Sequence, residues 1–149
     1  MTETARALLV AAILAAAGLA AYAVRILQQD PAEPGRLIGE LRFSQWAALL
    51  LAASGGAWLG IAAGHPPAAM GGLEVMIAIA TILVAAWTLH QDTRYALVVL
   101  GGAFVAHALV DIAHRPGGLA DDLAPRWFIV GCATHNLFMA AVCYGVRRR

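Results

Sequence analysis

Apolar residues gather in five long runs that short polar stretches separate. The runs cover approximately residues 5–27, 44–64, 70–90, 95–114 and 127–146. Each is close to the roughly 20 residues that an α-helix needs to cross the hydrocarbon core of a bilayer. The pattern therefore predicts an all-α integral membrane bundle of five transmembrane helices, with residues 1–149 forming a single transmembrane domain.

Proline placement supports this division, because proline lacks an N–H group and breaks helices. All six prolines lie between the runs: Pro31, Pro34, Pro66, Pro67, Pro116 and Pro125. The only long connection predicted runs from Gln28 to Gln45. Its middle, residues 37–43, is compatible with a short amphipathic turn along the headgroups or with a plain loop.

Composition agrees with a membrane protein and excludes a nucleic-acid-binding surface. Hydrophobic residues make up 61% of the chain and charged residues 13%, against roughly a quarter charged in an ordinary soluble domain. A soluble fold of this size could not bury so much apolar surface. The net charge is only +1, and all ten basic residues are Arg. We expect a lipid bilayer as partner, no nucleic acid, and a bacterial inner membrane.

Arginines are distributed unequally between the two ends of the predicted bundle. By the positive-inside rule, the arginine-rich end is cytoplasmic, so the C-terminus is predicted inside and the N-terminus outside. The rich end holds Arg25, Arg36, Arg42, Arg94, Arg147, Arg148 and Arg149, and the opposite end holds Arg6, Arg115 and Arg126.

Ionisable residues inside the apolar runs are the candidates for chemistry, since such groups are costly in a membrane. A helix turns about 100° per residue, so His107, Asp111 and His114 share one face of the fourth run. Glu74 in the third run and His135 in the fifth are expected at a similar depth, in the outer half of the bundle. Other polar or anchoring residues on these faces are Ser54, Trp58, His65, Thr81, Thr88, Cys132, Asn136, Met139 and Cys143.

Three interpretations of this cluster remain open. Imidazoles with a carboxylate are standard ligands for Zn or Fe, so His107, Asp111, His114 and His135 are predicted to hold a divalent transition metal. Glu74 would then be the catalytic base and proton shuttle. In the structural alternative, Asp111 accepts hydrogen bonds from the histidines of its helix, and Glu74 pairs with His135 or Arg126. In the third, His107 and His135 ligate a haem or a chlorophyll-type pigment.

The last third of the chain resembles an uncharacterised family of small bacterial and fungal multi-pass membrane proteins. That family shows a His-x-x-x-Asp-x-x-His helix, a short loop with Pro, an aromatic start to the next helix, and then a Cys. The matching residues are His107, Asp111, His114, Pro125, Trp127 and Cys132. The family often has a second His after the third position and an Asp beyond the Cys, where this chain has Arg115 and His135. The family has no assigned activity, so the resemblance implies where the site lies and not its chemistry.

Glycines recur along one face of the second run, where another helix could pack. Gly56, Gly60 and Gly64 recur at four-residue spacing, which lets helix backbones approach closely in lipid. Packing within the chain is the favoured interpretation, and a homo-oligomer or docking into a larger membrane complex is the alternative.

Two functions from different classes follow from these features. The leading hypothesis is a metal-dependent membrane enzyme, a hydrolase or oxidoreductase, acting on a lipophilic substrate at the outer leaflet. The alternative is a non-catalytic accessory or structural subunit of a larger membrane complex.

Overall fold

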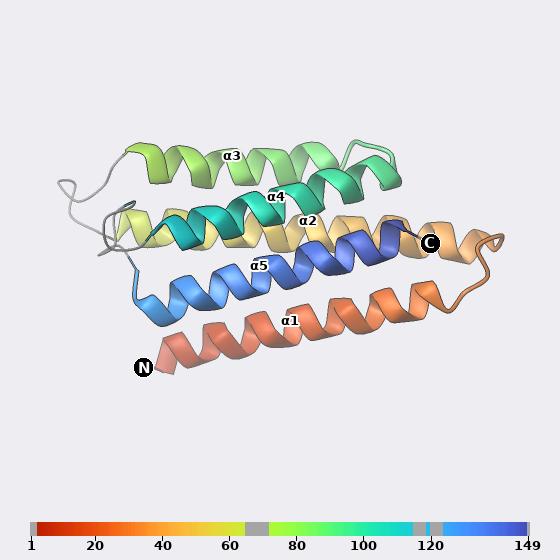
Figure 1. The fold of residues 1–149 in the computed structure, drawn as a ribbon, viewed down its shortest axis with the longest axis horizontal. Helices are drawn as coiled ribbons and strands as arrows, with labels where there is room; N and C mark the ends of the chain where they lie inside the picture. The colour runs from red at the N-terminus through yellow and green to blue at the C-terminus, as the bar shows by residue number, and fades with distance from the viewer. Residues whose placement is uncertain (1–2, 65–71, 115–118, 120–123, 149) are drawn as a thin grey trace.

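The described part of the chain is all-α and forms five helices that lie side by side (Figure 1). The computed structural model describes residues 3–64, 72–114, 119 and 124–148. Successive helices run in opposite directions, so the N-terminus and the C-terminus lie at opposite ends of the bundle. The helices are α1 (Glu3–Leu27), α2 (Pro34–Ala63), α3 (Gly72–Thr88), α4 (Thr93–Ala113) and α5 (Arg126–Arg147).

Four of these helices, α1, α2, α4 and α5, are long and apolar enough to cross a membrane. The remaining helix, α3, is apolar but has only 17 described residues. The prediction of an all-α bundle with several membrane-spanning segments is thus supported by helix length and composition.

Helix α2 differs from its predicted extent. It begins at Pro34 and has 30 residues, so most of the predicted 28–45 connection is helical. Proline at the first position of a helix is favourable because its missing N–H has no intrahelical partner there. The added turns also pack on the end of α1: a Cβ on Gly39 would lie 3.0 Å from the Ile26 side chain. Treating Pro34 only as a helix breaker was wrong, since it starts this helix.

The bundle is built from two well-packed helix pairs, α4 with α5 and α2 with α3, while α1 lies against α2 and α5. Apolar side chains from all five helices form the main core, to which α3 contributes only Ala85. Its large members include Ile26, Leu51, Leu100, Phe104 and Met139. A smaller apolar cluster of Trp58, Ala78, Ala124 and Ile129 lies toward the end where α2 finishes and α5 begins. The candidate site adjoins this second cluster.

The glycines of α2 lie on two different faces of the helix, one buried and one exposed. Gly55 is buried against α3, where an added Cβ would lie 2.9 Å from the backbone oxygen of Ala78. Gly56 and Gly60 are exposed, and a Cβ on either would meet nothing within 4 Å; Gly64 is also exposed. The expectation that the Gly56, Gly60 and Gly64 stripe packs within the chain was therefore wrong, because Gly55 occupies the close helix contact.

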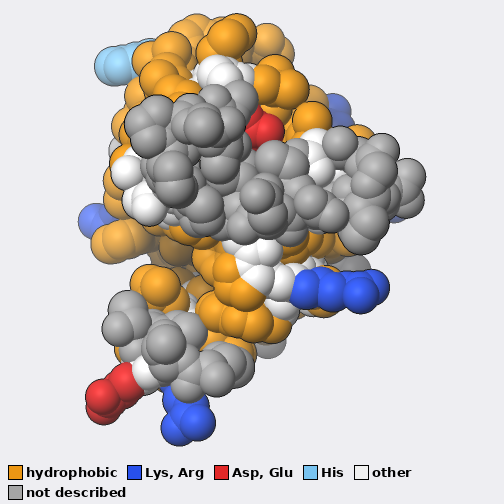
Figure 2. All heavy atoms as spheres, turned by 90° about the vertical axis from the view of Figure 1, so that its left-hand side faces the viewer, with side chains coloured by type: hydrophobic (Ala, Val, Ile, Leu, Met, Phe, Trp, Pro, Cys, Tyr) orange, Lys and Arg blue, Asp and Glu red, His pale blue; other side chains and the backbone are white. Residues whose placement is uncertain are grey.

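Large apolar side chains cover much of the outer surface, as expected for helices that face lipid. Leu14, Met76, Leu83 and Leu109 are each more than 60% exposed. Figure 2 shows the end of the bundle that carries the N-terminus. Most of the described side chains visible on this face are hydrophobic.

Candidate functional site

A buried carboxylate, that of Asp111 on α4, joins three helices near one end of the bundle. The Trp58 indole N–H of α2 donates to Asp111 Oδ1 at 2.8 Å, and the Asn136 amide of α5 donates to Oδ2 at 2.9 Å. The exposed fraction of Asp111 and of Asn136 is 0%. Hydrogen bonds to a buried carboxylate are stronger than those between neutral groups, so this residue fixes the mutual positions of α2, α4 and α5.

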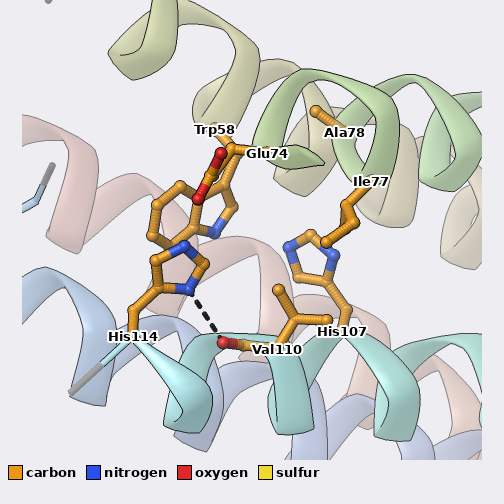
Figure 3. A pocket seen from close by; sticks show the side chains of 7 residues that line it. All are labelled: Trp58, Glu74, Ile77, Ala78, His107, Val110 and His114. Atoms are coloured by element: carbon orange, nitrogen blue, oxygen red, sulfur yellow. Dashed lines mark hydrogen bonds between the residues drawn. The ribbon is translucent and has the colours of Figure 1, made fainter. Parts of the chain in front are cut away.

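A small cavity lies beside this carboxylate, between α2, α3 and α4. Its volume is about 10 Å³, close to the smallest space that holds one water molecule. Figure 3 shows Trp58, Glu74, His107 and His114 around this space. The apolar part of the wall comes from Ile77, Ala78 and Val110.

Both cavity histidines are oriented by their Nδ1 atoms. His114 Nδ1 lies 2.8 Å from the Val110 carbonyl oxygen; a carbonyl can only accept, so Nδ1 carries the proton. The Thr81 hydroxyl donates to the Ile77 carbonyl at 2.8 Å and lies 3.3 Å from His107 Nδ1. With its proton used, the hydroxyl accepts from His107 Nδ1–H. In each neutral ring, Nε2 is then the atom with a free lone pair.

Three buried polar atoms at this cavity have no hydrogen-bond partner among the residues that the structure describes: His107 Nε2, His114 Nε2 and Glu74 Oε2. Their residues are only 3%, 4% and 7% exposed. Most buried polar groups in native proteins are paired, and an unpaired one is costly. All three of these atoms lie around one cavity.

The remaining contacts hold the rings in place. The Trp58 and His114 rings stack with centroids 4.5 Å apart, and Phe128 meets Trp58 edge-on at 5.8 Å. His107 Nε2 lies 3.9 Å from Asp111 Oδ1, which is too long for a hydrogen bond.

The structure brings together some of the predicted site residues and not others. Glu74, His107 and His114 line the cavity, and Asp111 lies next to it with both oxygens engaged. His135 is half-buried and does not line the cavity. Within the described residues, no three His, Cys, Asp or Glu side chains stand close enough to hold a metal ion as placed. His65 and Arg115 lie outside the described residues.

The structure agrees only in part with the alternative in which these polar residues simply hold the helices together. Asp111 does accept two hydrogen bonds, but from Trp58 and Asn136 rather than from the histidines of its own helix. Among the described residues, Glu74 forms no ion pair with Arg126 or His135. For the pigment alternative, the space beside His107 is far smaller than a tetrapyrrole.

Three residues that complete the site were noted in the sequence without a role: Trp58, Thr81 and Asn136. Trp58 lies deeper in its run than the other tryptophans, and a buried indole N–H usually needs an acceptor. That depth was the available signal for a polar partner. Thr81 shares a helical stripe with Glu74, and Asn136 directly follows His135 in the sequence.

No family model, curated protein or solved structure matches this chain.

Proposed function

We propose that this is an integral membrane protein of a bacterial inner membrane, N-terminus outside, with a divalent transition-metal site at its outer end. The site would serve an enzyme that acts on a lipophilic substrate from the outer leaflet. The orientation is supported by the excess of arginines at the opposite end. The four long apolar helices support insertion.

One observation carries the metal proposal: two imidazole nitrogens and one carboxylate oxygen line the same cavity, all buried and all without a partner among the described residues. Two histidines with one carboxylate is a recurrent donor set of catalytic Zn and Fe sites. Metal-bound histidines almost always donate their other ring N–H to a carbonyl or another acceptor. His114 and His107 make such contacts with Val110 and Thr81.

The ligand set that the structure favours differs from the one predicted from the sequence. His107, His114 and Glu74 would hold the ion, so Glu74 is proposed as a ligand in place of a proton shuttle. Asp111 becomes a positioning residue, because Trp58 and Asn136 already occupy its two oxygens. His135 has no part in the set. Since the donors are too far apart as placed, binding requires their side chains to move inward.

A divalent ion bound there would polarise a substrate carbonyl or phosphoryl oxygen and lower the pKa of a bound water. The chain's own residues would do the rest. Val110 and Thr81 fix the ring orientations, the Trp58 ring covers His114, and the apolar wall excludes bulk water. A low-dielectric surrounding strengthens every charge interaction within the site.

The test is the metal content of protein purified in mild detergent, stripped with a chelator, reloaded with Zn²⁺ or Fe²⁺ and dialysed. We expect a stoichiometric ion in the wild type and in His135→Ala, and loss of the ion in His107→Ala and in His114→Ala. His90→Ala is the matched control, since His90 is exposed at the other end of the bundle. Wild-type protein that retains no metal would refute the proposal. Loss of the ion in His135→Ala as well as in His107→Ala and His114→Ala would instead support the ligand set predicted from the sequence.

A second candidate is a non-catalytic subunit of a larger membrane assembly. The observation in its favour is that Gly56 and Gly60 face open space on α2, as small residues do where another helix packs in lipid. Gly60→Leu should then reduce the size of the assembly that the protein forms in mild detergent. Gly102→Leu is the control and should leave that size unchanged, because Gly102 is exposed on α4 and a Cβ there would meet no described atom within 4 Å. An unchanged size for Gly60→Leu would remove this support.

A further inference from the structure

An open groove lies at the opposite end of the bundle from the candidate site, between the start of α4 and the end of α5. Its volume is about 630 Å³. Six residues line it: Arg94, Tyr95, Val98, Tyr144, Arg147 and Arg148. The groove is therefore basic and aromatic, with an apolar residue farther along α4.

The groove arginines form no ion pair with any acidic residue that the structure describes. In the described part of the chain, Arg36 is the only arginine paired with a carboxylate, that of Glu40 at 3.0 Å. No acidic residue lines the groove. Asp92, just before α4, already accepts a hydrogen bond from the backbone N–H of Tyr95 at 3.0 Å. Three cationic side chains around one hollow attract an anion, and guanidinium binds phosphate in a bidentate manner.

Two tyrosines, Tyr95 and Tyr144, line the groove beside the arginines. The Arg148 guanidinium lies over the Tyr144 ring, 4.7 Å from its centroid. The Trp87 and Tyr95 rings meet edge-on at 5.8 Å. Tyr and Trp concentrate where a membrane protein passes through the headgroup layer. The groove thus lies where a phosphate headgroup would be in a bilayer.

The apolar side of the groove distinguishes a lipid from a soluble phosphate. Val98 is 42% exposed and lies one helical turn into the bundle from Arg94. An acyl chain that follows a bound headgroup would lie against this face, whereas a free phosphate would leave it unused. Basic pockets between transmembrane helices commonly hold acidic lipid headgroups.

We propose that this groove binds the phosphate of an anionic phospholipid, with Arg94, Arg147 and Arg148 as its ligands. The proposal rests on membrane insertion and is independent of the metal site. By the arginine distribution, the lipid would belong to the cytoplasmic leaflet.

The test is native mass spectrometry of purified protein in micelles that contain equal amounts of phosphatidylglycerol and phosphatidylcholine. We expect the wild type to retain phosphatidylglycerol preferentially. Arg94→Gln/Arg147→Gln should lose this preference, on the order of fivefold for each arginine removed. Arg25→Gln/Arg42→Gln is the matched control, with the same charge change on exposed arginines at the same end but outside the groove.

Three outcomes would overturn the proposal. The first is that the wild type retains both lipids equally, and the second is that the groove variant keeps the preference for phosphatidylglycerol. The third is that both double variants lose the preference equally, which would mean that net charge alone determines it. Glycerol phosphate is added in a separate arm. If it displaces the lipid at equal concentration, the groove binds free phosphate esters and the acyl chain adds nothing. Unfolding midpoints in zwitterionic detergent show whether each variant remains folded.

Discussion

Asp111 is the residue whose loss should damage the structure most. Replacing it with Ala removes the acceptor of both the Trp58 indole and the Asn136 amide. Each buried donor left without a partner costs about 1–3 kcal/mol. We therefore expect Asp111→Ala to lower the free energy of unfolding by about 2–6 kcal/mol, measured by denaturant titration in detergent micelles.

Asp111→Asn is the informative companion variant. It keeps an oxygen for Trp58, and Asn136 can turn its amide to present Oδ1, which is buried without a partner in the wild type. The loss of stability should then be clearly smaller than for Asp111→Ala. Equal losses would mean that charge, rather than hydrogen bonding, holds this site together.

At the residue scale, the sequence predicted part of the candidate site. Helical periodicity placed His107, Asp111 and His114 on one face, because that spacing depends only on the helix itself. It did not reveal which residue of α5 meets them. Neighbouring residues differ by about 100° around a helix, so Asn136 reaches Asp111 while His135 does not. The rotation of a helix is set by packing against its neighbours, which one sequence does not display.

At the scale of the helix, the contact between α2 and α3 depends on one glycine. A Cβ on Gly55 would approach the Ala78 backbone oxygen to 2.9 Å, and backbone atoms cannot move aside cheaply. We expect Gly55→Ala to destabilise the protein by about 1–3 kcal/mol, as overpacking does. The measurement is the shift in the unfolding midpoint in micelles.

Gly56→Ala provides the control at the adjacent position. It meets nothing within 4 Å, and alanine favours a helix over glycine by up to about 1 kcal/mol. Its midpoint should stay unchanged or rise. A similar loss in both variants would contradict the close approach of α2 and α3 at Gly55.

The helices themselves were largely predictable, because length, hydropathy and proline placement are local properties. The start of α2 was not. Pro34 has two opposite meanings, a break within a helix or a favourable first residue. Only the contacts of the first turns with α1, such as Gly39 against Ile26, decide between them.

At the scale of the whole molecule, the orientation in the membrane is the first quantity to measure. The arginine distribution predicts that the turn around Gln91 is cytoplasmic and that the start of α5 is outside. In a background with Ser at Cys132 and Cys143, we expect Arg126→Cys to react with a membrane-impermeant maleimide in intact cells. Gln91→Cys should react only after lysis. The reverse pattern would place the candidate site at the cytoplasmic face.

The two ends of the molecule differ in their polar groups. One end buries Glu74, His107 and His114 around a small cavity, and the other exposes three arginines beside an aromatic groove. The sequence indicated both charge patterns. The cavity and the groove were not predictable, since each depends on how separate helices pack.

The central claim is that His107 and His114 hold one metal ion together with Glu74. X-ray absorption of the Zn-loaded protein tests it most directly, because imidazole ligands give a distinct multiple-scattering signature. We predict a shell of nitrogen and oxygen with two imidazoles in the wild type and in His135→Ala, and no retained zinc in His114→Ala. A shell without imidazole, or one that loses an imidazole in His135→Ala, would contradict the account.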